Sequence, residues 1–378
     1  MADISSKLRK AVERSGITRV SVVAWRDLDD PEAGGSEIHA DEIMKRWSSA
    51  GLEIDSWTSA VPGRASRVER NGYTAHRTGG RYEIFPAVIL RGLFSRRSNR
   101  PDAVVEIWNG MPFLSPLWHR GRRLVLIHHV HGEMWQMTLP GLLGRLGWLV
   151  EHRLAPPFYR RSVISTLSTS SRMEIEERLR LRSVLVVPPG ISPFFKPGDM
   201  RSKVPLVVAV GRLVPVKRFD LLIRHFVEVR KTVPSACFVI VGEGYLRTEL
   251  EELIRECGAE DWISLPGRIS DNELLDLYQR AWLVTSISLR EGWGMSLTEA
   301  AACGTPSVAV DIAGHRDAVK DGSSGLLVSE TLIGSVISDV LLDDARLSQL
   351  RSGALTYADT LTWDIAALRL FELLTQSR

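Results

Sequence analysis

Two successive alternations of short β-branched runs with longer helical runs constrain this chain more than any other feature. Such alternation is typical of a parallel sheet whose strands are joined by crossover helices. Residues 187–197 separate the two alternations, and their four prolines and one glycine exclude a helix or a central strand there. We therefore predict an α/β protein with two Rossmann-like, doubly wound domains, residues 1–190 and 191–350. Residues 351–378 are expected to form a helix that crosses back to the first domain.

The expected strands are the short apolar runs. In the first domain they are residues 19–25, 53–58, 103–107, 124–127, 162–167 and 183–187, with helices at 35–50 and 171–182. In the second domain they are residues 205–210, 236–241, 262–265, 283–285, 306–310 and 325–328, and a closing helical segment spans 353–374. Sheets of this kind bind ligands at the carboxyl ends of their strands, so we expect a ligand cleft between the domains.

Composition excludes several classes of protein. With 44% hydrophobic and 25% charged residues, the chain is neither disordered nor fibrous. It has no apolar run of about 18 residues and no signal-peptide core in its first thirty residues. Its three cysteines, Cys237, Cys257 and Cys303, form neither a disulfide framework nor a C-x-x-C metal site. We expect a cytoplasmic protein with reduced, structural cysteines.

Charge is distributed unevenly between the two halves. Residues 1–190 hold 28 Lys+Arg against 20 Asp+Glu, a balance of +8, within a chain whose net charge is +3. The densest basic stretch contains nine arginines, Arg64, Arg67, Arg70, Arg77, Arg81, Arg91, Arg96, Arg97 and Arg100. This stretch predicts contact with an anionic membrane surface at the inner face of the plasma membrane, or with an acidic acceptor. The alternative is an ordinary solvated face.

The stretch from Glu291 to Pro306 is the most informative motif. A loop with Gly292 and Gly294 leads into a helix that begins near Met295, so free N–H groups and the positive helix end face the loop and suit a phosphate or a sugar hydroxyl. Glu299 lies in the second turn of that helix, eight residues after Glu291. Ionised carboxylates are acceptors suited to ribose and hexose hydroxyls.

This stretch resembles the E-x7-E signature of retaining glycosyltransferases of family 4, which have the GT-B fold. The resemblance extends from Ala33-Gly-Gly-Ser-Glu37 through the proline-rich linker and Gly211-Arg-Leu-x-x-x-Lys217 to Gly314 and Asp321-Gly-Ser-Ser-Gly325. It implies that Glu291 contacts the donor sugar and Glu299 the ribose. It also places Gly292, Trp293, Gly294, Met295 and Ser296 around the donor. Trp293 stands where the family usually has Phe, and the acidic residue usual near Gly314 is displaced.

The resemblance places Arg212 and Lys217, after Gly211, on the donor diphosphate. A leaving nucleoside diphosphate gains negative charge as the glycosidic bond breaks, so two fixed cations can take the place of a divalent metal. We therefore predict that no metal or other cofactor is required. The only candidate metal ligands, Asp27, Asp29 and Asp30, are interpreted as a turn.

Other strand ends complete the expected donor site. Gly34 and Gly35 open a helix and resemble the family's glycine loop, although a plain helix start is the alternative. Gly242 and Gly244 form a strand–Gly-x-Gly turn that lacks the third glycine of a dinucleotide fingerprint, since Arg247 stands in its place. Arg268 and Ile269 match the family's position for contacts with the base.

Three histidines, His128, His129 and His131, follow the strand 124–127. A zinc site lacks further ligands at a suitable spacing. The family has one histidine near the reactive face of the sugar, for which His129 is the first choice and His128 the second. Trp25, Trp108 and Trp135 follow predicted strands and are candidates for stacking on sugar rings, with core packing as the alternative.

We predict a hexosyltransferase that transfers a sugar, with retention, from a UDP- or GDP-sugar to a glycan, lipid-linked or small-molecule acceptor. No nucleic-acid partner is expected. The alternatives are a nucleotide-sugar epimerase of GT-B fold and a non-catalytic sugar-nucleotide-binding protein.

Overall fold

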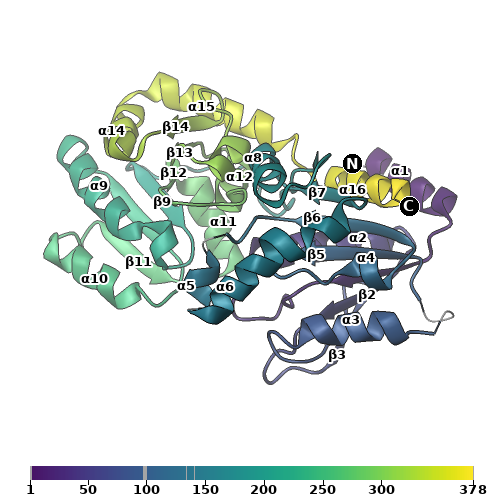
Figure 1. Cartoon of the computed structure of the whole chain (residues 1–378). Helices are drawn as coiled ribbons and strands as arrows, with labels where there is room; N and C mark the ends of the chain where they lie inside the picture. The colour runs from purple at the N-terminus through teal and green to yellow at the C-terminus, as the bar shows by residue number, and fades with distance from the viewer. Residues whose placement is uncertain (1, 97–99, 133, 140, 378) are drawn as a thin grey trace. The chain divides into compact units, whose positions relative to one another are not determined.

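The computed structural model describes residues 2–96, 100–132, 134–139 and 141–377, which form two compact units. The first unit runs to Gly190 and also contains the segment that begins at Trp363. The second unit is Ile191–Thr362. Each unit is built on one twisted, mainly parallel sheet with helices on its faces, as predicted (Figure 1).

The sheet of the first unit has the strand order β3-β4-β2-β1-β5-β6-β7-β8. All its pairs are parallel except the antiparallel pair β3–β4. The strands are β1 (Arg19–Val23), β2 (Glu53–Thr58), β3 (Arg67–Arg70), β4 (Tyr73–Arg77), β5 (Ala103–Trp108), β6 (Arg122–Ile127), β7 (Val163–Thr166) and β8 (Leu185–Val186).

The helices of the first unit include both ends of the chain. They are α1 (Ala2–Ser15), α2 (Gly35–Ser49), α3 (Ile84–Phe94), α4 (Ser115–Trp118), α5 (Met134–Thr138), α6 (Leu142–Leu149), η2 (Val150–Leu154), α7 (Pro156–Tyr159), α8 (Thr169–Glu174), η3 (Ile175–Leu179) and α16 (Trp363–Gln376). Helix α16 packs on α1 and α2, where Trp47 Nε1 donates to Ala367 O at 2.9 Å and Arg46 Nε lies 2.6 Å from Asp364 Oδ1.

The sheet of the second unit is parallel throughout, in the order β11-β10-β9-β12-β13-β14. Its strands are β9 (Leu206–Val210), β10 (Cys237–Val241), β11 (Ile263–Gly267), β12 (Leu283–Ser286), β13 (Ser307–Val310) and β14 (Gly325–Val328). Its helices are η4 (Pro215–Lys217), α9 (Phe219–Thr232), α10 (Arg247–Glu256), α11 (Asp271–Arg280), α12 (Met295–Ala302), α13 (Ala313–Ala318), η5 (Glu330–Leu332), α14 (Ile333–Leu342) and α15 (Asp344–Ala358).

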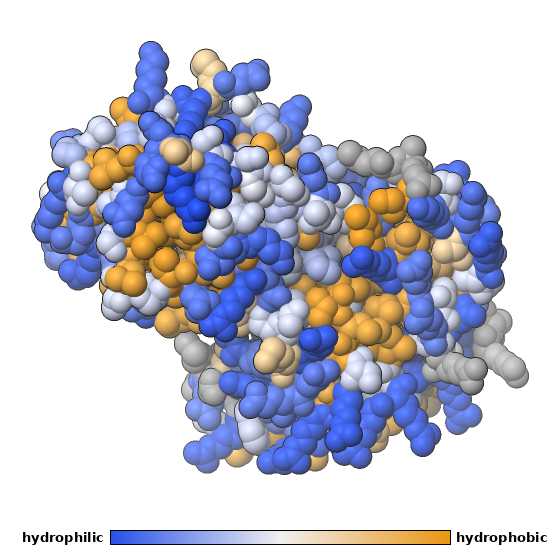
Figure 2. Space-filling model, turned by 90° about the horizontal axis from the view of Figure 1, so that it is seen from above, coloured by the Kyte–Doolittle hydropathy of each residue, from blue (hydrophilic) through white to orange (hydrophobic). Residues whose placement is uncertain are grey.

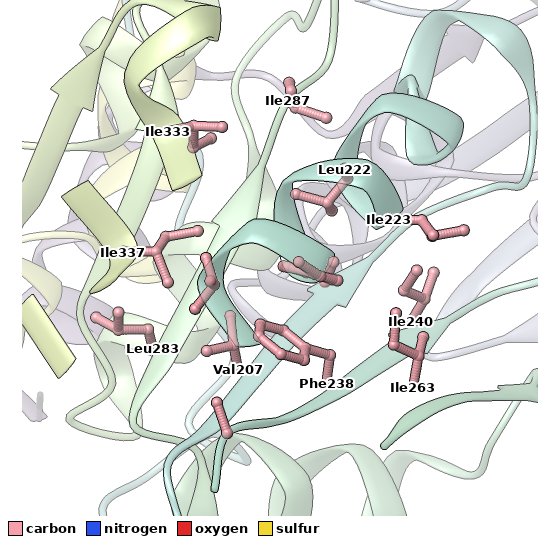
Figure 3. Packing of buried hydrophobic residues seen from close by; sticks show 14 of the residues in the cluster. Val207, Leu222, Ile223, Phe238, Ile240, Ile263, Leu283, Ile287, Ile333 and Ile337 are labelled. Atoms are coloured by element: carbon pink, nitrogen blue, oxygen red, sulfur yellow. The ribbon is translucent and has the colours of Figure 1, made fainter. Parts of the chain in front are cut away.

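The core of the second unit lies between its sheet and the helices α9, α10 and α14 (Figure 3). Phe226 of α9 stacks on Phe238 of β10 with ring centroids 3.9 Å apart, and both rings are buried. Strands covered on both faces carry continuous apolar runs, which is why this sheet was readable from the sequence.

The structure corrects two sequence predictions of secondary structure. The hairpin β3–β4 was missed because its strands are only four and five residues long and contain no continuous apolar run. The closing segment is two helices, because α15 ends at Ala358 and α16 begins only at Trp363. The second unit therefore extends to Thr362 rather than to 350.

The surface is mixed in character. Figure 2 shows hydrophobic residues gathered in patches between hydrophilic ones on one face, as is usual for folded proteins. None of the helices in the described ranges is long and apolar enough to cross a membrane.

Candidate functional site

The predicted donor residues of the second unit gather where its strand order reverses. Strand β9 is flanked by β10 and β12, and the chain leaves these strands in opposite directions across the sheet. Lys217 ends η4 in the loop after β9, and Glu291 lies in the loop after β12. Leu289 N donates to Val216 O at 2.8 Å, which ties the two loops together. Doubly wound sheets bind their ligands at this position.

An ion pair joins these loops. Lys217 Nζ contacts Glu291 Oε1, and Ser288 Oγ donates to the same oxygen at 2.8 Å. Burial disfavours the ionised form of Glu291, but the charge and hydrogen bond of Lys217 outweigh this and hold the pKa of the carboxyl below its usual value. Glu291 is therefore an anion whose second oxygen, Oε2, accepts no hydrogen bond from the described residues.

The helix α12 begins three residues beyond this pair. Gly294 precedes it with a φ of 114°, a conformation that favours glycine, and no side chain caps the helix. The first N–H groups of α12, at Met295 and Ser296, are therefore free to bind an anion. Trp293 is buried, whereas Gly292 is half-buried.

Glu299 lies one turn further along α12. It is half-buried, and Tyr278 Oη lies 3.4 Å from its Oε2. Burial raises the pKa of Glu299 to about 7, because no cation compensates its charge. The surroundings thus shift the pKa values of the two glutamates in opposite directions, down for Glu291 and up for Glu299.

Three residues of the site were missed by sequence reasoning. Tyr278 comes from α11, which gave no signal, and Ser288 lies in a loop that was not singled out. His315 follows Gly314, and its Nδ1–H donates to Val310 O at 2.7 Å. The ring is fully buried, which lowers its pKa. The neighbouring Gly314 is the sequence signal that could have pointed to His315. A glycine is needed there, because a Cβ would lie 2.3 Å from Glu291 O.

The predicted glycine loops lie beside one another at the ends of β9, β10 and β11. Gly211 N donates to Val241 O at 2.9 Å and Gly242 N to Gly267 O at 3.0 Å. A Cβ at Gly242 would lie 1.9 Å from Gly211 O, and one at Gly244 would lie 2.3 Å from Leu213 O. These glycines are required for the loops to approach each other.

The predicted cations beside these loops are accessible. Arg212 is exposed, and no carboxylate in the described part of the chain pairs with it. Arg268 is also exposed, and Ile269 next to it is half-buried.

Gly34 and Gly35 belong to the first unit, where Gly34 is the N-cap of α2. The Gly34 N–H is already used, because it donates to Glu37 Oε2 at 2.8 Å. Glu37 is itself buried and lies 3.5 Å from Arg26 Nε. This loop is therefore a capped helix start of the first unit.

The histidines after β6 have separate roles. His128 is buried, with Nδ1 3.2 Å from Asn109 Oδ1 and Nε2 3.1 Å from His39 Nδ1. Burial lowers the pKa of His128 strongly and that of His39 to about 4. Both ring nitrogens of His128 therefore have partners inside the first unit, and its second-choice assignment to the substrate stays a prediction. His129 is half-buried, and its ring stacks on that of His131 at 4.9 Å.

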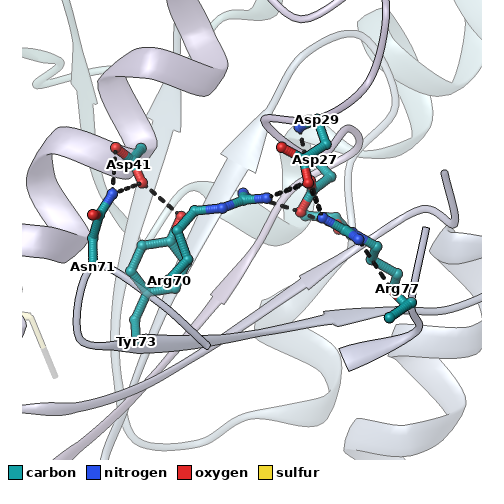
Figure 4. Close-up of polar contacts among 9 residues, drawn as sticks. Asp27, Asp29, Asp41, Arg70, Asn71, Tyr73 and Arg77 are labelled. Carbon is teal, nitrogen blue, oxygen red and sulfur yellow. Dashed lines mark hydrogen bonds and ion pairs between the residues drawn. The ribbon is translucent and has the colours of Figure 1, made fainter. Parts of the chain in front are cut away.

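The predicted acidic turn and basic stretch meet inside the first unit (Figure 4). Arg77 Nη2 lies 2.9 Å from Asp27 Oδ1, and Arg70 Nη2 lies 2.7 Å from Asp29 Oδ2. Burial opposes ionisation of Asp27, but its bonds with Arg77 and Arg70 outweigh this and lower its pKa. The turn is therefore structural. Among the residues that the structure describes, no cluster of His, Cys, Asp or Glu could hold a metal ion.

This pairing changes the interpretation of the basic stretch. Arg77 is buried and Arg70 is half-buried, both in ion pairs, and Arg81 pairs with Glu32 at 2.8 Å. Arg91 lies over the Trp57 ring at 3.7 Å. Arg97 lies outside the described residues. Much of the stretch predicted to face a membrane therefore contacts the protein instead.

Two of the three candidate stacking tryptophans are core residues. Trp108 is fully buried and donates through Nε1 to Gly110 O at 2.8 Å. Trp135 is buried and donates through Nε1 to Glu151 Oε2 at 2.8 Å. Trp25 is half-buried, and the guanidinium groups of Arg26 and Arg81 each lie 5.0 Å from its ring centroid.

Known proteins match the chain along most of its length. Residues 33–193 match the model of Glycosyltransferase Family 4, and residues 192–353 match that of Glycosyl transferases group 1. The D-inositol 3-phosphate glycosyltransferase of Thermobispora bispora is 24% identical over 97% of this chain and 96% of that protein. The one from Stackebrandtia nassauensis is 27% identical over 96% and 93%.

Solved structures show the same fold. Sucrose-phosphate synthase from Thermosynechococcus elongatus superposes with a TM-score of 0.78 at 18% identity, over 95% of this chain and 98% of that one. Anabaena HepE, in complex with UDP and glucose, superposes with a TM-score of 0.72 at 17% identity, over 95% and 100%. The fold and the matched families together define the class of the protein, a glycosyltransferase with the GT-B architecture. Within that class the chain belongs to the family 4 type.

Proposed function

We propose that the enzyme transfers a hexose, with retention of configuration, from a UDP- or GDP-sugar that binds to the second unit without a metal ion. The observation that carries this proposal is the Lys217–Glu291 ion pair beside the uncapped start of α12. Cation, anion acceptor and free N–H groups meet at the strand-order reversal, where a nucleotide ligand is expected. The UDP in the complex of the structural neighbour from Anabaena supports a nucleoside diphosphate as the ligand.

The charges fit the needs of the leaving group. As the bond between the anomeric carbon and the phosphate oxygen breaks, the electron pair stays on the diphosphate. Lys217, the exposed Arg212 and the first N–H groups of α12 stabilise that charge. Oε2 of Glu291 accepts from a hydroxyl of the transferred sugar, and Glu299 accepts from the ribose.

The acceptor attacks from the face that the diphosphate leaves. A new bond forms between its oxygen and the anomeric carbon, and its proton passes to the departing phosphate oxygen. This same-face route needs no protein nucleophile and gives retention. His129, half-buried after β6 in the first unit, is proposed to face the sugar.

We propose a phosphorylated acceptor, because the balance of +8 in residues 1–190 attracts an anion. The relatives named for D-inositol 3-phosphate support a small phosphorylated acceptor. A lipid-linked phosphate offers the same charge. We favour a transferase over the two alternatives, a nucleotide-sugar epimerase and a non-catalytic binding protein, because the relatives are named as transferases.

The test is product formation with the purified full-length chain. UDP-glucose, UDP-N-acetylglucosamine and GDP-mannose are each combined with inositol 3-phosphate, with unphosphorylated inositol, or with an undecaprenyl-phosphate-linked sugar. Mass spectrometry detects the glycoside and proton NMR its anomeric configuration. We expect an α-glycoside of a phosphorylated acceptor, with none from unphosphorylated inositol. A β-linked product would contradict retention, and transfer to unphosphorylated inositol would contradict the acceptor assignment.

A further inference from the structure

Helix α6 of the first unit has its small residues inside and its large apolar residues outside. Gly144 and Gly147 are buried. A Cβ at Gly147 would lie 2.5 Å from the Trp135 ring, and one at Gly144 would lie 2.1 Å from Leu139 O. The glycine face of α6 is therefore the face that packs on the protein. This is the reverse of the usual amphipathic helix, whose large apolar residues face the core.

The opposite face of α6 is apolar and exposed. Leu142 is 81% exposed and Leu143 62%, although a leucine of a soluble protein normally packs inside. The exposed apolar surface continues through η2 and α7. Its members are Leu142, Leu143, Leu146, Trp148, Leu149, Leu154 and Phe158. We call these residues, together with the polar ones between them, the 141–161 surface.

Only positive charge is exposed on the 141–161 surface. Four arginines lie among its apolar residues, all of them exposed, namely Arg145, Arg153, Arg160 and Arg161. The sole carboxylate in these residues, Glu151, is 1% exposed. It accepts hydrogen bonds from His131 N, Gly132 N and Trp135 Nε1 at 2.8–3.2 Å. The next acidic side chain along the chain is Glu174, beyond β7.

We propose that the 141–161 surface docks on an anionic lipid surface, with the leucines of α6 at the boundary of the acyl chains and the arginines at the headgroups. Arginine stems can lie along apolar surface while their guanidinium groups reach phosphate, and Trp148 suits the interface. The elements are far too short to span a bilayer, so they lie in its surface. A second copy of the chain is not the expected partner. If two such surfaces packed together, the arginines of one would lie against the arginines of the other, with no exposed carboxylate to pair with them.

The inference does not depend on the proposed donor or acceptor chemistry. It replaces the basic stretch 64–100 as the membrane contact, because several arginines of that stretch are used inside the first unit. The 141–161 surface is tied to the loop after β6, because the buried Glu151 of η2 accepts hydrogen bonds from His131 N and Gly132 N.

The test is co-sedimentation of the full-length protein with phosphatidylglycerol or phosphatidylcholine vesicles at low and high salt. We expect binding to the anionic vesicles only, weakened at high salt by screening. Arg145→Gln with Arg160→Gln should weaken binding by about fivefold per arginine. Leu142→Ser with Leu146→Ser should abolish it. Leu332→Ser with Leu342→Ser, at exposed leucines of the second unit, is the matched control and should bind like the wild type.

Several outcomes would overturn the proposal. The first is wild-type protein that ignores anionic vesicles at low salt. Another is loss of binding in Arg91→Gln with Arg96→Gln but not in the variants of α6. A lipid-free dimer that dissociates in Leu142→Ser with Leu146→Ser, seen by light scattering, would assign the surface to a second copy instead. Circular dichroism and the melting temperature confirm that each variant is folded.

Discussion

Lys217 Nζ and Glu291 Oε1 form an ion pair between the loops after β9 and β12, and Ser288 Oγ donates to the same oxygen. The pair fixes a cation and an anion at the strand-order reversal of the second unit before any ligand binds. It leaves Oε2 of Glu291 to accept from a sugar hydroxyl. The pair therefore predicts that Glu291 acts on the transferred sugar rather than on the nucleotide.

The two glutamates are expected to separate binding from turnover. Glu291→Gln removes the anion that accepts from the transferred sugar, so the transfer rate should fall by about 100-fold or more while nucleoside diphosphate affinity changes little. Glu299→Gln should mainly weaken nucleotide affinity. Steady-state kinetics and calorimetry with UDP and GDP measure both effects. Equal losses of nucleotide affinity in the two variants would contradict the separate roles.

Nucleotide affinity should depend on pH through Glu299, whose pKa burial raises to about 7 from 4.5. Because the folded, ligand-free protein holds this proton more tightly than the unfolded chain, the stability from Glu299 is full below pH 4.5 and is lost as pH rises through 7. Ribose hydroxyls favour the ionised carboxylate, so affinity should rise by up to about thirtyfold between pH 5.5 and 8.

The control for this pH dependence is Glu299→Gln, which keeps the shape of the side chain and does not titrate. Protonation of the ligand phosphates affects both proteins equally. A slope in the variant as steep as in the wild type would assign the pH dependence to another group.

Two glycines of the predicted site should respond differently to alanine. Gly242 has a φ of 149°, and a Cβ there would lie 1.9 Å from Gly211 O, so Gly242→Ala should destabilise the second unit by at least about 1–3 kcal/mol. At Gly34 a Cβ meets nothing within 4 Å, so Gly34→Ala should keep the fold. Thermal unfolding compares them. Equal stability of Gly242→Ala and the wild type would refute the close approach of the two loops.

The acidic turn should be structural. Asp27→Asn weakens the ion pairs of Arg77 and Arg70, but both still pair with Asp29, so we expect the free energy of unfolding of the first unit to fall by about 1–3 kcal/mol. Urea unfolding measures the loss, with Asp261→Asn at an exposed site as the control. A change as small as that of the control would show that the network of Figure 4 contributes little.

The sequence predicted secondary structure best where burial alone determines which residues a segment can contain. Strands buried on both faces, such as β9 and β10, need continuous apolar runs and were predicted closely. The hairpin β3–β4 is half exposed and was missed. Pairing across long separations was also invisible, because Arg77 meets Asp27 only once β4 lies near the loop after β1. For the same reason the sequence could place Lys217 and Glu291 on loops but not against each other.

The central claim is that the second unit binds a nucleoside diphosphate by its own charges, without a metal. Isothermal titration of UDP and of GDP into the wild-type protein in EDTA tests it most directly, beside Arg212→Ala and Lys217→Ala. The account predicts saturable binding of at least one nucleotide in EDTA, weakened about tenfold or more in each variant. Binding that appears only with magnesium, or that both variants retain at wild-type strength, would contradict it.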